Sequence, residues 1–224
     1  MPNYLEVKYN KNTKPYTAYP LKMCRYLFER FAMKKGDKLL DIGCGRGDFT
    51  QAFKDLGLDV TGIDRERGDK AVLEGIDVSL SNDLENNAFP FEDNSFDIVF
   101  SKSVIEHIGN PNNFMRETHR VLKPGGRVVT MTPDWHSQMY IFYDDPTHVH
   151  PYTTTGLKDL FAIYGFKDAQ AELFYQLPVV WKYPFMKIVC LGLQLLGPVK
   201  KIYKNKLIRW SRELMILGNG IKDR

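Results

Sequence analysis

The chain has 224 residues, of which 43% are hydrophobic, and a formal net charge of +4 at pH 7. This length and apolar content suffice for one α/β domain with a substantial core and exclude two domains of ordinary size. The three cysteines are widely spaced and form no C-x-x-C pair, which excludes a disulfide framework and a cysteine-based metal site. The first residues lack a basic-then-apolar secretory pattern, so we expect a cytoplasmic protein.

The first predicted element is an amphipathic helix over residues 21–31, which ends before a polar turn at residues 34–37. Three tyrosines precede or join this helix. We therefore expect residues 1–36 to form a helical lid over a bound ligand.

Residues 39–47 combine the end of a strand, an acidic residue and a turn with three glycines. Glycines at 43, 45 and 47 allow the backbone to come close to a ligand. The dinucleotide fingerprint G-x-G-x-x-G, begun at Gly43, would need a third glycine at position 48, where the chain has Asp48. The G-x-G-x-G form therefore indicates a nucleoside-type cofactor other than NAD or FAD.

Alternating helix and strand patterns follow this turn to the end of the chain. A helix ending before Gly57 and a strand over 58–63 complete one βαβ unit. The later predicted elements are strands at 76–80 and 96–101, a helix from Pro111 to 122, a strand at 127–132, a helix at 155–164, a strand of about eight residues from Phe166, and a final strand at 213–218.

Five ordered blocks resemble the class I S-adenosylmethionine-dependent methyltransferases, most closely their type 11 branch. The first is the motif D-x-G-C-G-x-G at residues 41–47, and the others are Val60-Thr61-Gly62-Ile63-Asp64, Asn82-Asp83-Leu84, Ser95 to Ser101 with Glu106-His107, and Leu122-Lys123-Pro124-Gly125-Gly126. The resemblance implies an α/β fold: a Rossmann-like, seven-stranded, mostly parallel sheet with an antiparallel last strand and helices on both faces. It also implies one methyltransferase domain over residues 1–224.

The resemblance further implies S-adenosylmethionine as the cofactor and S-adenosylhomocysteine as the product. Asp64 would accept hydrogen bonds from the ribose hydroxyls, Asp83 with Leu84 would contact the adenine, and Asp41 would position the methionine end. The full set of predicted cofactor residues is Asp41, Gly43, Cys44, Gly45, Gly47, Asp64, Arg65, Asp83, Leu84 and Ser101.

A hydroxyl acceptor needs a general base, whereas an amine or thiolate needs mainly alignment. We predict His148, His107 and Tyr152 as the catalytic residues, with His150 and Asp134 as further candidates. Each histidine also has a structural interpretation, as a helix-end or pocket imidazole bonded to nearby backbone.

His148 and His150 share one face if that segment is extended, and Asp144 and Asp145 are close in sequence. Such a set could ligate a metal. Because type 11 enzymes typically need none, we predict no metal.

Residues 173–212 contain no Asp or Glu and eight Lys or Arg, which leaves −4 for the rest of the chain. Within them, 178–209 is predicted as a basic, apolar insertion before the last strand. Its apolar run is too short to cross a membrane. Two interpretations remain open. The segment could attach the protein peripherally to the anionic inner face of a membrane, or it could form a cap on the sheet or a homodimer interface. Nucleic-acid binding is not indicated.

The leading functional hypothesis is O-methylation of a small-molecule, sugar or lipid-linked acceptor by in-line methyl transfer. The alternative is a non-catalytic S-adenosylmethionine-binding regulatory or partner subunit. A nicotinamide oxidoreductase is disfavoured by the glycine spacing.

Overall fold

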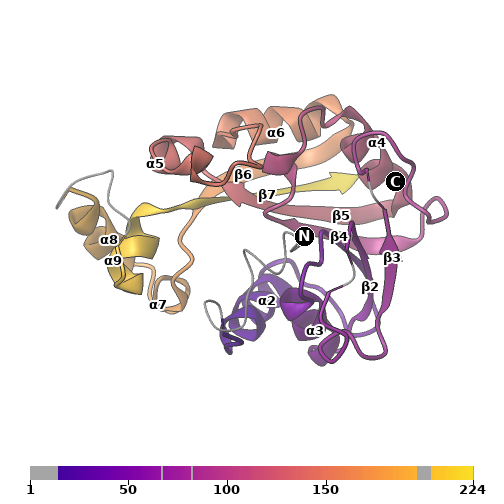
Figure 1. Ribbon diagram of the computed structural model, residues 1–224, viewed down its shortest axis with the longest axis horizontal. Coiled ribbons are helices and arrows are strands. Elements are labelled where there is room, and N and C mark those ends of the chain that lie inside the picture. Colours follow the sequence, from indigo (N-terminus) through magenta and orange to yellow (C-terminus); the bar gives the residue numbers. More distant parts are fainter. Residues whose placement is uncertain (1–14, 67, 82, 196–202, 224) are drawn as a thin grey trace.

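The computed structural model describes residues 15–66, 68–81, 83–195 and 203–223. A seven-stranded sheet with the order β3-β2-β1-β4-β5-β7-β6 runs through the centre of the molecule (Figure 1). Its strands are β1 (Lys38–Ile42), β2 (Asp59–Asp64), β3 (Asp77–Leu80), β4 (Phe96–Lys102), β5 (Leu122–Pro133), β6 (Phe166–Phe174) and β7 (Met215–Lys222). The first five are parallel, and β7 lies antiparallel between β5 and β6. The predicted Rossmann-like sheet with its antiparallel last strand is therefore confirmed.

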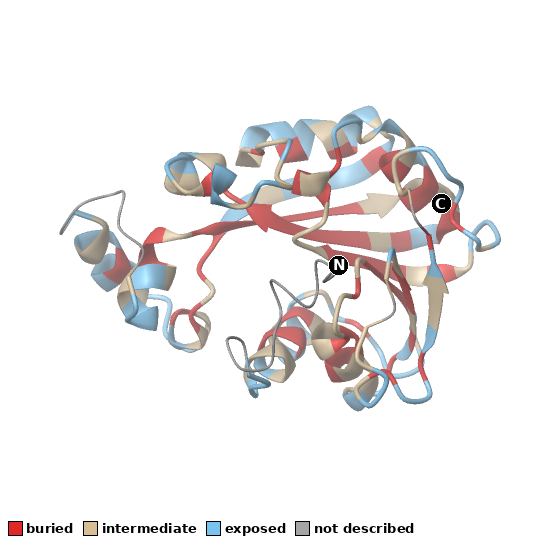
Figure 2. Cartoon of the chain, viewed as in Figure 1, coloured by how far each residue is buried: buried red, intermediate tan, exposed pale blue. Residues whose placement is uncertain are grey.

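Helices cover both faces of the sheet (Figure 1). Neighbouring residues of a strand point to opposite faces, so Leu39 and Leu40 of β1 belong to different core clusters. Leu39 packs in the cluster that includes α2 (Tyr19–Arg30) and α3 (Asp48–Asp55), and Leu40 in the cluster that includes α4 (Asn112–Val121) and α6 (Thr154–Ile163). Figure 2 shows the central strands buried between these layers. Burial on both faces explains why these strands are almost continuously apolar.

The N-terminal helix α2 confirms the helix predicted over residues 21–31. It buries Met23, Cys24 and Leu27 against the sheet because these residues lie on one side of the helix. Residues 1–14 of the expected lid lie outside the described residues. The lid therefore stays a prediction.

The fifth strand is longer than predicted. α4 ends at Val121, and the extended backbone begins at once with Leu122, which pairs with Phe96 of β4. The register of this pair shifts between Phe96 and Ile98. Because β5 begins at Leu122, it includes Gly125 and Gly126, although the Pro-Gly-Gly sequence at 124–126 predicts only the end of a helix. The final strand also runs four residues beyond its predicted end at 218, to Lys222.

The described residues between β6 and β7 form the helices α7 (Pro178–Lys182), α8 (Met186–Leu195) and α9 (Lys206–Arg212). Trp181 of α7 stacks on Tyr26 of α2, with ring centroids 5.1 Å apart, and Trp210 of α9 contacts Tyr19 at 5.0 Å. These aromatic pairs join the segment to the main body. Among the described residues, every helix is too short or too polar to span a bilayer.

Candidate functional site

The glycine turn after β1 has a backbone that only glycine fits. Gly43 has φ +71°, and a Cβ there would come within 2.2 Å of Cγ2 of Val104. The amide of Gly43 donates a 2.7 Å hydrogen bond to the carbonyl of Ile63 in β2. The turn is therefore held against the end of the neighbouring strand, and the absent Cβ lets Val104 pack directly on the turn.

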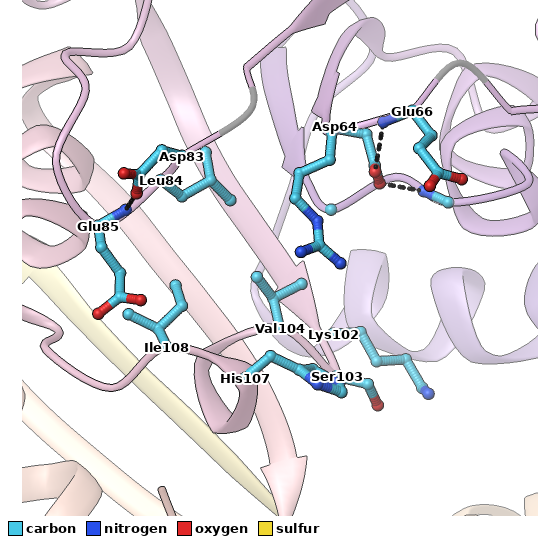
Figure 3. Close-up of a pocket in the computed structure, with 13 residues that line it drawn as sticks. Asp64, Glu66, Asp83, Leu84, Glu85, Lys102, Ser103, Val104, His107 and Ile108 are labelled. Carbon is cyan, nitrogen blue, oxygen red and sulfur yellow. Dashed lines mark hydrogen bonds between the residues drawn. The ribbon is translucent and has the colours of Figure 1, made fainter. Parts of the chain in front are cut away.

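Asp64, the last residue of β2, ties this turn to the next loop. Its Oδ2 accepts a 2.8 Å hydrogen bond from the amide of Gly45, and its Oδ1 accepts one from the amide of Glu66 at 3.2 Å (Figure 3). A carboxylate next to the turn is well placed to accept bonds from ligand hydroxyls. The predicted position of Asp64 beside the glycine turn is what the structure shows.

A cavity of about 190 Å³ opens at this carboxyl-end edge of the sheet, as expected for the switch point of an open parallel sheet. Six of the ten predicted cofactor residues line it: Gly43, Gly45, Asp64, Arg65, Asp83 and Leu84. Its other walls are Glu66, Glu85, Lys102, Ser103, Val104, His107 and Ile108. Figure 3 shows Asp64 and Asp83 approaching from different segments, with Val104 below them.

Asp83 also caps its own loop. Its Oδ2 accepts a 2.7 Å hydrogen bond from the side-chain amide of Asn86, and its Oδ1 accepts bonds from the amides of Glu85 and Asn86. The bond from the Asn86 side chain is the main cause of the lowered pKa of Asp83. The carboxylate is therefore ionised at neutral pH.

The remaining predicted cofactor residues, Asp41, Cys44, Gly47 and Ser101, are not in the cavity wall. Asp41 is 2% exposed and accepts a 2.6 Å hydrogen bond from the hydroxyl of Thr50 in α3. Burial raises its pKa to about 7, against the effect of that bond. Ser101 is also buried and donates to the hydroxyl of Thr130 at 3.1 Å. Contact of these four residues with a cofactor stays a prediction.

Two of the three predicted catalytic residues lie together. The ring centroids of His107 and His148 are 4.7 Å apart, although only His107 is in the cavity wall. Burial and the nearby His148 lower the pKa of His107. His150 does not join them but stacks on Tyr152, with ring centroids 4.5 Å apart.

Tyr152 is 4% exposed, and its hydroxyl makes no hydrogen bond within the described parts of the chain. Burial, reinforced by the carboxyl of Glu106, raises the pKa of the Tyr152 hydroxyl. At neutral pH this group keeps its proton, so it is better suited to donate a hydrogen bond than to accept a proton. The catalytic role of all three residues stays a prediction.

The chain resembles known proteins in its sequence and in its fold. The family model described as "Methyltransferase domain" matches residues 17–171. The chain belongs to this methyltransferase family. Its members are class I enzymes of the type 11 kind, and the family uses S-adenosylmethionine.

The curated relatives of this methyltransferase include the ubiquinone biosynthesis O-methyltransferase of Pseudomonas syringae pv. tomato. The two are 33% identical over 113 residues, which is 48% of this chain and 49% of the relative. The corresponding Bordetella avium enzyme is 32% identical over 131 residues, 55% of this chain and 53% of its own. The methyltransferase thus spans about half the length of these relatives.

Solved structures share its fold. A chain from the complex of the Haloferax volcanii Trm112 methyltransferase activator with a methyltransferase superposes with a TM-score of 0.72 at 16% identity, covering all of both chains.

Sequence reasoning assigned no role to several residues of this methyltransferase that the cavity exposes. Lys102 ends β4, Ser103 and Val104 follow it, and all three line the cavity wall. The rule that ligands bind at the carboxyl ends of parallel strands could have found them. Glu106 was noted only as part of a motif, yet it is 0% exposed, and burial raises its pKa to about 7. A carboxyl group in that setting is a strong signal of function or of a missing partner.

Proposed function

We propose that this methyltransferase transfers the methyl group of S-adenosylmethionine to an oxygen atom of a small-molecule or lipid-linked acceptor. The observation that carries the proposal is the cavity at the glycine turn, where Asp64 and Gly45 are joined by a 2.8 Å hydrogen bond. Gly43 and Gly45 both line this cavity, so a ligand in it lies against the backbone of the turn, which fits a nucleoside cofactor. The name of the curated relatives supports an oxygen acceptor and a quinone-like precursor.

S-adenosylmethionine supplies a methyl group on a sulfonium, which is already a reactive donor for in-line displacement. The chain's main contribution is then alignment of donor and acceptor. Asp64 and Asp83 would orient the nucleoside from two walls of the cavity. A hydroxyl acceptor must also lose its proton, and the low pKa of His107 keeps that imidazole neutral beside the cavity.

The function is tested with methyl-labelled S-adenosylmethionine and a host extract separated into organic, aqueous and macromolecular fractions. We expect label in the organic fraction for a lipid-linked acceptor, or in the aqueous fraction for a sugar. Asp64→Ala should weaken cofactor binding by about 1.5 to 3 kcal/mol, because it removes charge-assisted hydrogen bonds. That is about 10- to 150-fold in the dissociation constant measured by calorimetry.

Asp59→Ala is the matched control, since Asp59 is exposed and lies at the opposite end of the same strand. It should keep wild-type affinity. Equal affinity in Asp64→Ala and wild type would refute the ribose assignment. Tight cofactor binding with no label in any fraction would favour the non-catalytic binding subunit instead.

We infer that the basic insertion at 178–209 lies on an anionic lipid surface. Its helix α8 buries Cys190 toward the protein but exposes a set of large apolar side chains on the other side. These are Ile188, Val189, Leu191 and Leu195, of which Ile188 is 72% and Leu195 87% exposed, and the exposed Phe185 directly precedes the helix. Lys182, Lys187, Lys204 and Lys206 belong to the same segment, whereas Lys200 and Lys201 lie outside the described residues. Apolar side chains among lysines suit an interfacial segment.

Replacing Phe185, Ile188 and Leu191 together by serine should therefore reduce sedimentation with vesicles of anionic lipids. Each fully inserted side chain contributes about 1.5 kcal/mol or more, so the loss of even one such insertion weakens partition about tenfold, and the loss of all three weakens it about a thousandfold. Ile163→Ser is the control, because Ile163 is 76% exposed on α6, outside the insertion. Unchanged sedimentation of the triple variant, together with a smaller mass in solution, would favour the homodimer interface.

A further inference from the structure

Three potential metal ligands from two separate segments meet beside the cofactor cavity. Glu106 and His107 belong to the short helix η1 (Ile105–His107) after β4, and His148 lies in the loop before α6. One ligand atom of each lies within 4.8 Å of the other two. The amides of Val149 and His150 both donate to the carbonyl of Glu106, at 2.9 and 3.0 Å. The two segments are thus joined by backbone at the cluster itself.

Hydrogen bonds select the tautomer of both imidazoles. Nδ1 of His148 lies 2.7 Å from the carbonyl oxygen of Phe142, and Nδ1 of His107 lies 3.1 Å from that of Thr147. A carbonyl oxygen can only accept, so each Nδ1 carries the proton in the neutral ring. The lone pair of each ring is then on Nε2. Histidines that bind metals are oriented by the same type of second bond, from the other ring nitrogen to a carbonyl or carboxylate.

Glu106 supplies an independent observation that points to a ligand. Its side chain is fully buried, and its Oε2 accepts a 3.0 Å hydrogen bond from the hydroxyl of Thr132. Its Oε1 is buried and has no hydrogen-bond partner in the described part of the chain. Buried polar atoms are nearly always satisfied, so an oxygen in this state calls for an explanation. A cation held between Glu106 and the two imidazoles provides one.

We propose that Glu106, His107 and His148 bind a divalent transition-metal cation of the Zn²⁺, Mn²⁺ or Co²⁺ class. Two imidazoles and one carboxylate suit these ions, whereas Mg²⁺ and Ca²⁺ prefer oxygen ligands throughout. Three protein ligands also leave coordination positions for a substrate atom, as in catalytic zinc sites. The sequence-based prediction of no metal considered His148 with His150, Asp144 and Asp145. The folded chain instead groups His148 with Glu106 and His107.

The position of the site suggests its use. His107 also lines the cofactor cavity, so the cation would adjoin the space where donor and acceptor meet. A cation there would hold the acceptor oxygen and favour loss of its proton to water, with both histidines acting as ligands. This role rests on the proposed methyl transfer to oxygen. Binding of the cation does not, because it follows from the three side chains alone.

The test has two parts. The metal-free protein is titrated with Co²⁺ while the visible absorption of the bound ion is measured, and it is titrated with Zn²⁺ and with Mn²⁺ in a calorimeter. We expect one cation per chain. Glu106→Gln and His148→Ala should each bind at least about tenfold more weakly. S-adenosylhomocysteine binding is measured on every variant, and retained affinity shows that the variant is folded. His150→Ala is the matched control, because this neighbouring ring stacks on Tyr152 outside the cluster and should keep wild-type cation binding.

Two results would overturn the metal site. One is the absence of binding of all three ions to wild-type protein that binds S-adenosylhomocysteine. The other is cation binding that Glu106→Gln and His148→Ala leave unchanged. Cation binding without methyl transfer to any extract fraction would support the metal site and count against the proposed function alone. Methyl transfer by a protein that binds no cation would do the reverse.

Discussion

Gly43→Ala should destabilise the protein by about 2 to 5 kcal/mol and also weaken cofactor binding. The left-handed backbone at φ +71° costs an alanine about 1 to 2 kcal/mol. The new Cβ would lie 2.2 Å from Cγ2 of Val104, and overpacking of this kind costs a further 1 to 3 kcal/mol, roughly. Val104 lines the cavity, so any shift that relieves the contact also changes the cofactor site. Denaturant unfolding and calorimetry with S-adenosylhomocysteine measure the two effects.

Gly36→Ala separates backbone strain from crowding. Gly36 has φ +84°, but no atom lies within 4 Å of a Cβ built there. We therefore expect only the cost of a left-handed backbone for alanine, about 1 to 2 kcal/mol. Gly43→Ala combined with Val104→Ala removes the clashing methyl group and should recover part of the lost stability. If Gly36→Ala and Gly43→Ala are equally destabilised and bind the cofactor equally well, the predicted clash between a Cβ at position 43 and Val104 is contradicted.

Asp41→Asn should remove about 2 to 3 kcal/mol of pH dependence from the stability of the cofactor-free protein between pH 5 and pH 8. Burial raises the pKa of Asp41 from its ordinary 3.8 to about 7, although the Thr50 hydroxyl donates to it. The folded chain therefore keeps a proton that the unfolded chain has lost between these values. The stability contributed by that proton is fully present below pH 3.8 and is lost as the pH rises through 7.

Denaturant unfolding at pH 5, 6, 7 and 8 measures this difference. The asparagine side chain cannot ionise, so the free energy of unfolding of the variant should increase relative to that of the wild type as the pH rises. Asp77→Asn is the control, since Asp77 is exposed at the start of β3, and its profile should parallel that of the wild type. Parallel profiles for Asp41→Asn and wild type would mean that Asp41 is not held protonated by burial.

Most of the sheet could be predicted from the sequence because its signals are local. The apolar strands, the helix before Gly57 and the glycine turn each depend on neighbours within a few residues. The seven strands and the antiparallel last strand were implied by the family resemblance rather than by periodicity, and the order of the strands came from the structure. The boundaries of β5 could not be predicted, because Leu122 is extended by its pairing with Phe96, a residue from another strand.

The sequence predicted part of the cofactor site, namely the residues at the ends of the parallel strands. Residues at the end of a strand or directly after it, such as Asp64 and Gly43, reach the cavity because all parallel strands end at one edge. Asp41 and Ser101 lie within strands, and their side chains point toward α3 and β5 respectively. Motif position alone does not state which way a strand residue points.

By itself, the sequence determined the class of fold and the cofactor turn, since glycine spacing and strand-end carboxylates act over a few residues. The tertiary structure decided which distant groups meet. His148 reaches His107 only because the loop before α6 is bonded to the carbonyl of Glu106, and no local pattern encodes that contact. The same is true of the buried carboxyl of Glu106, whose Oε1 has no hydrogen-bond partner among the residues that the structure describes, because this depends on every segment packed around it. Burial is a property of the assembled chain, so it could not be predicted from a motif of two residues.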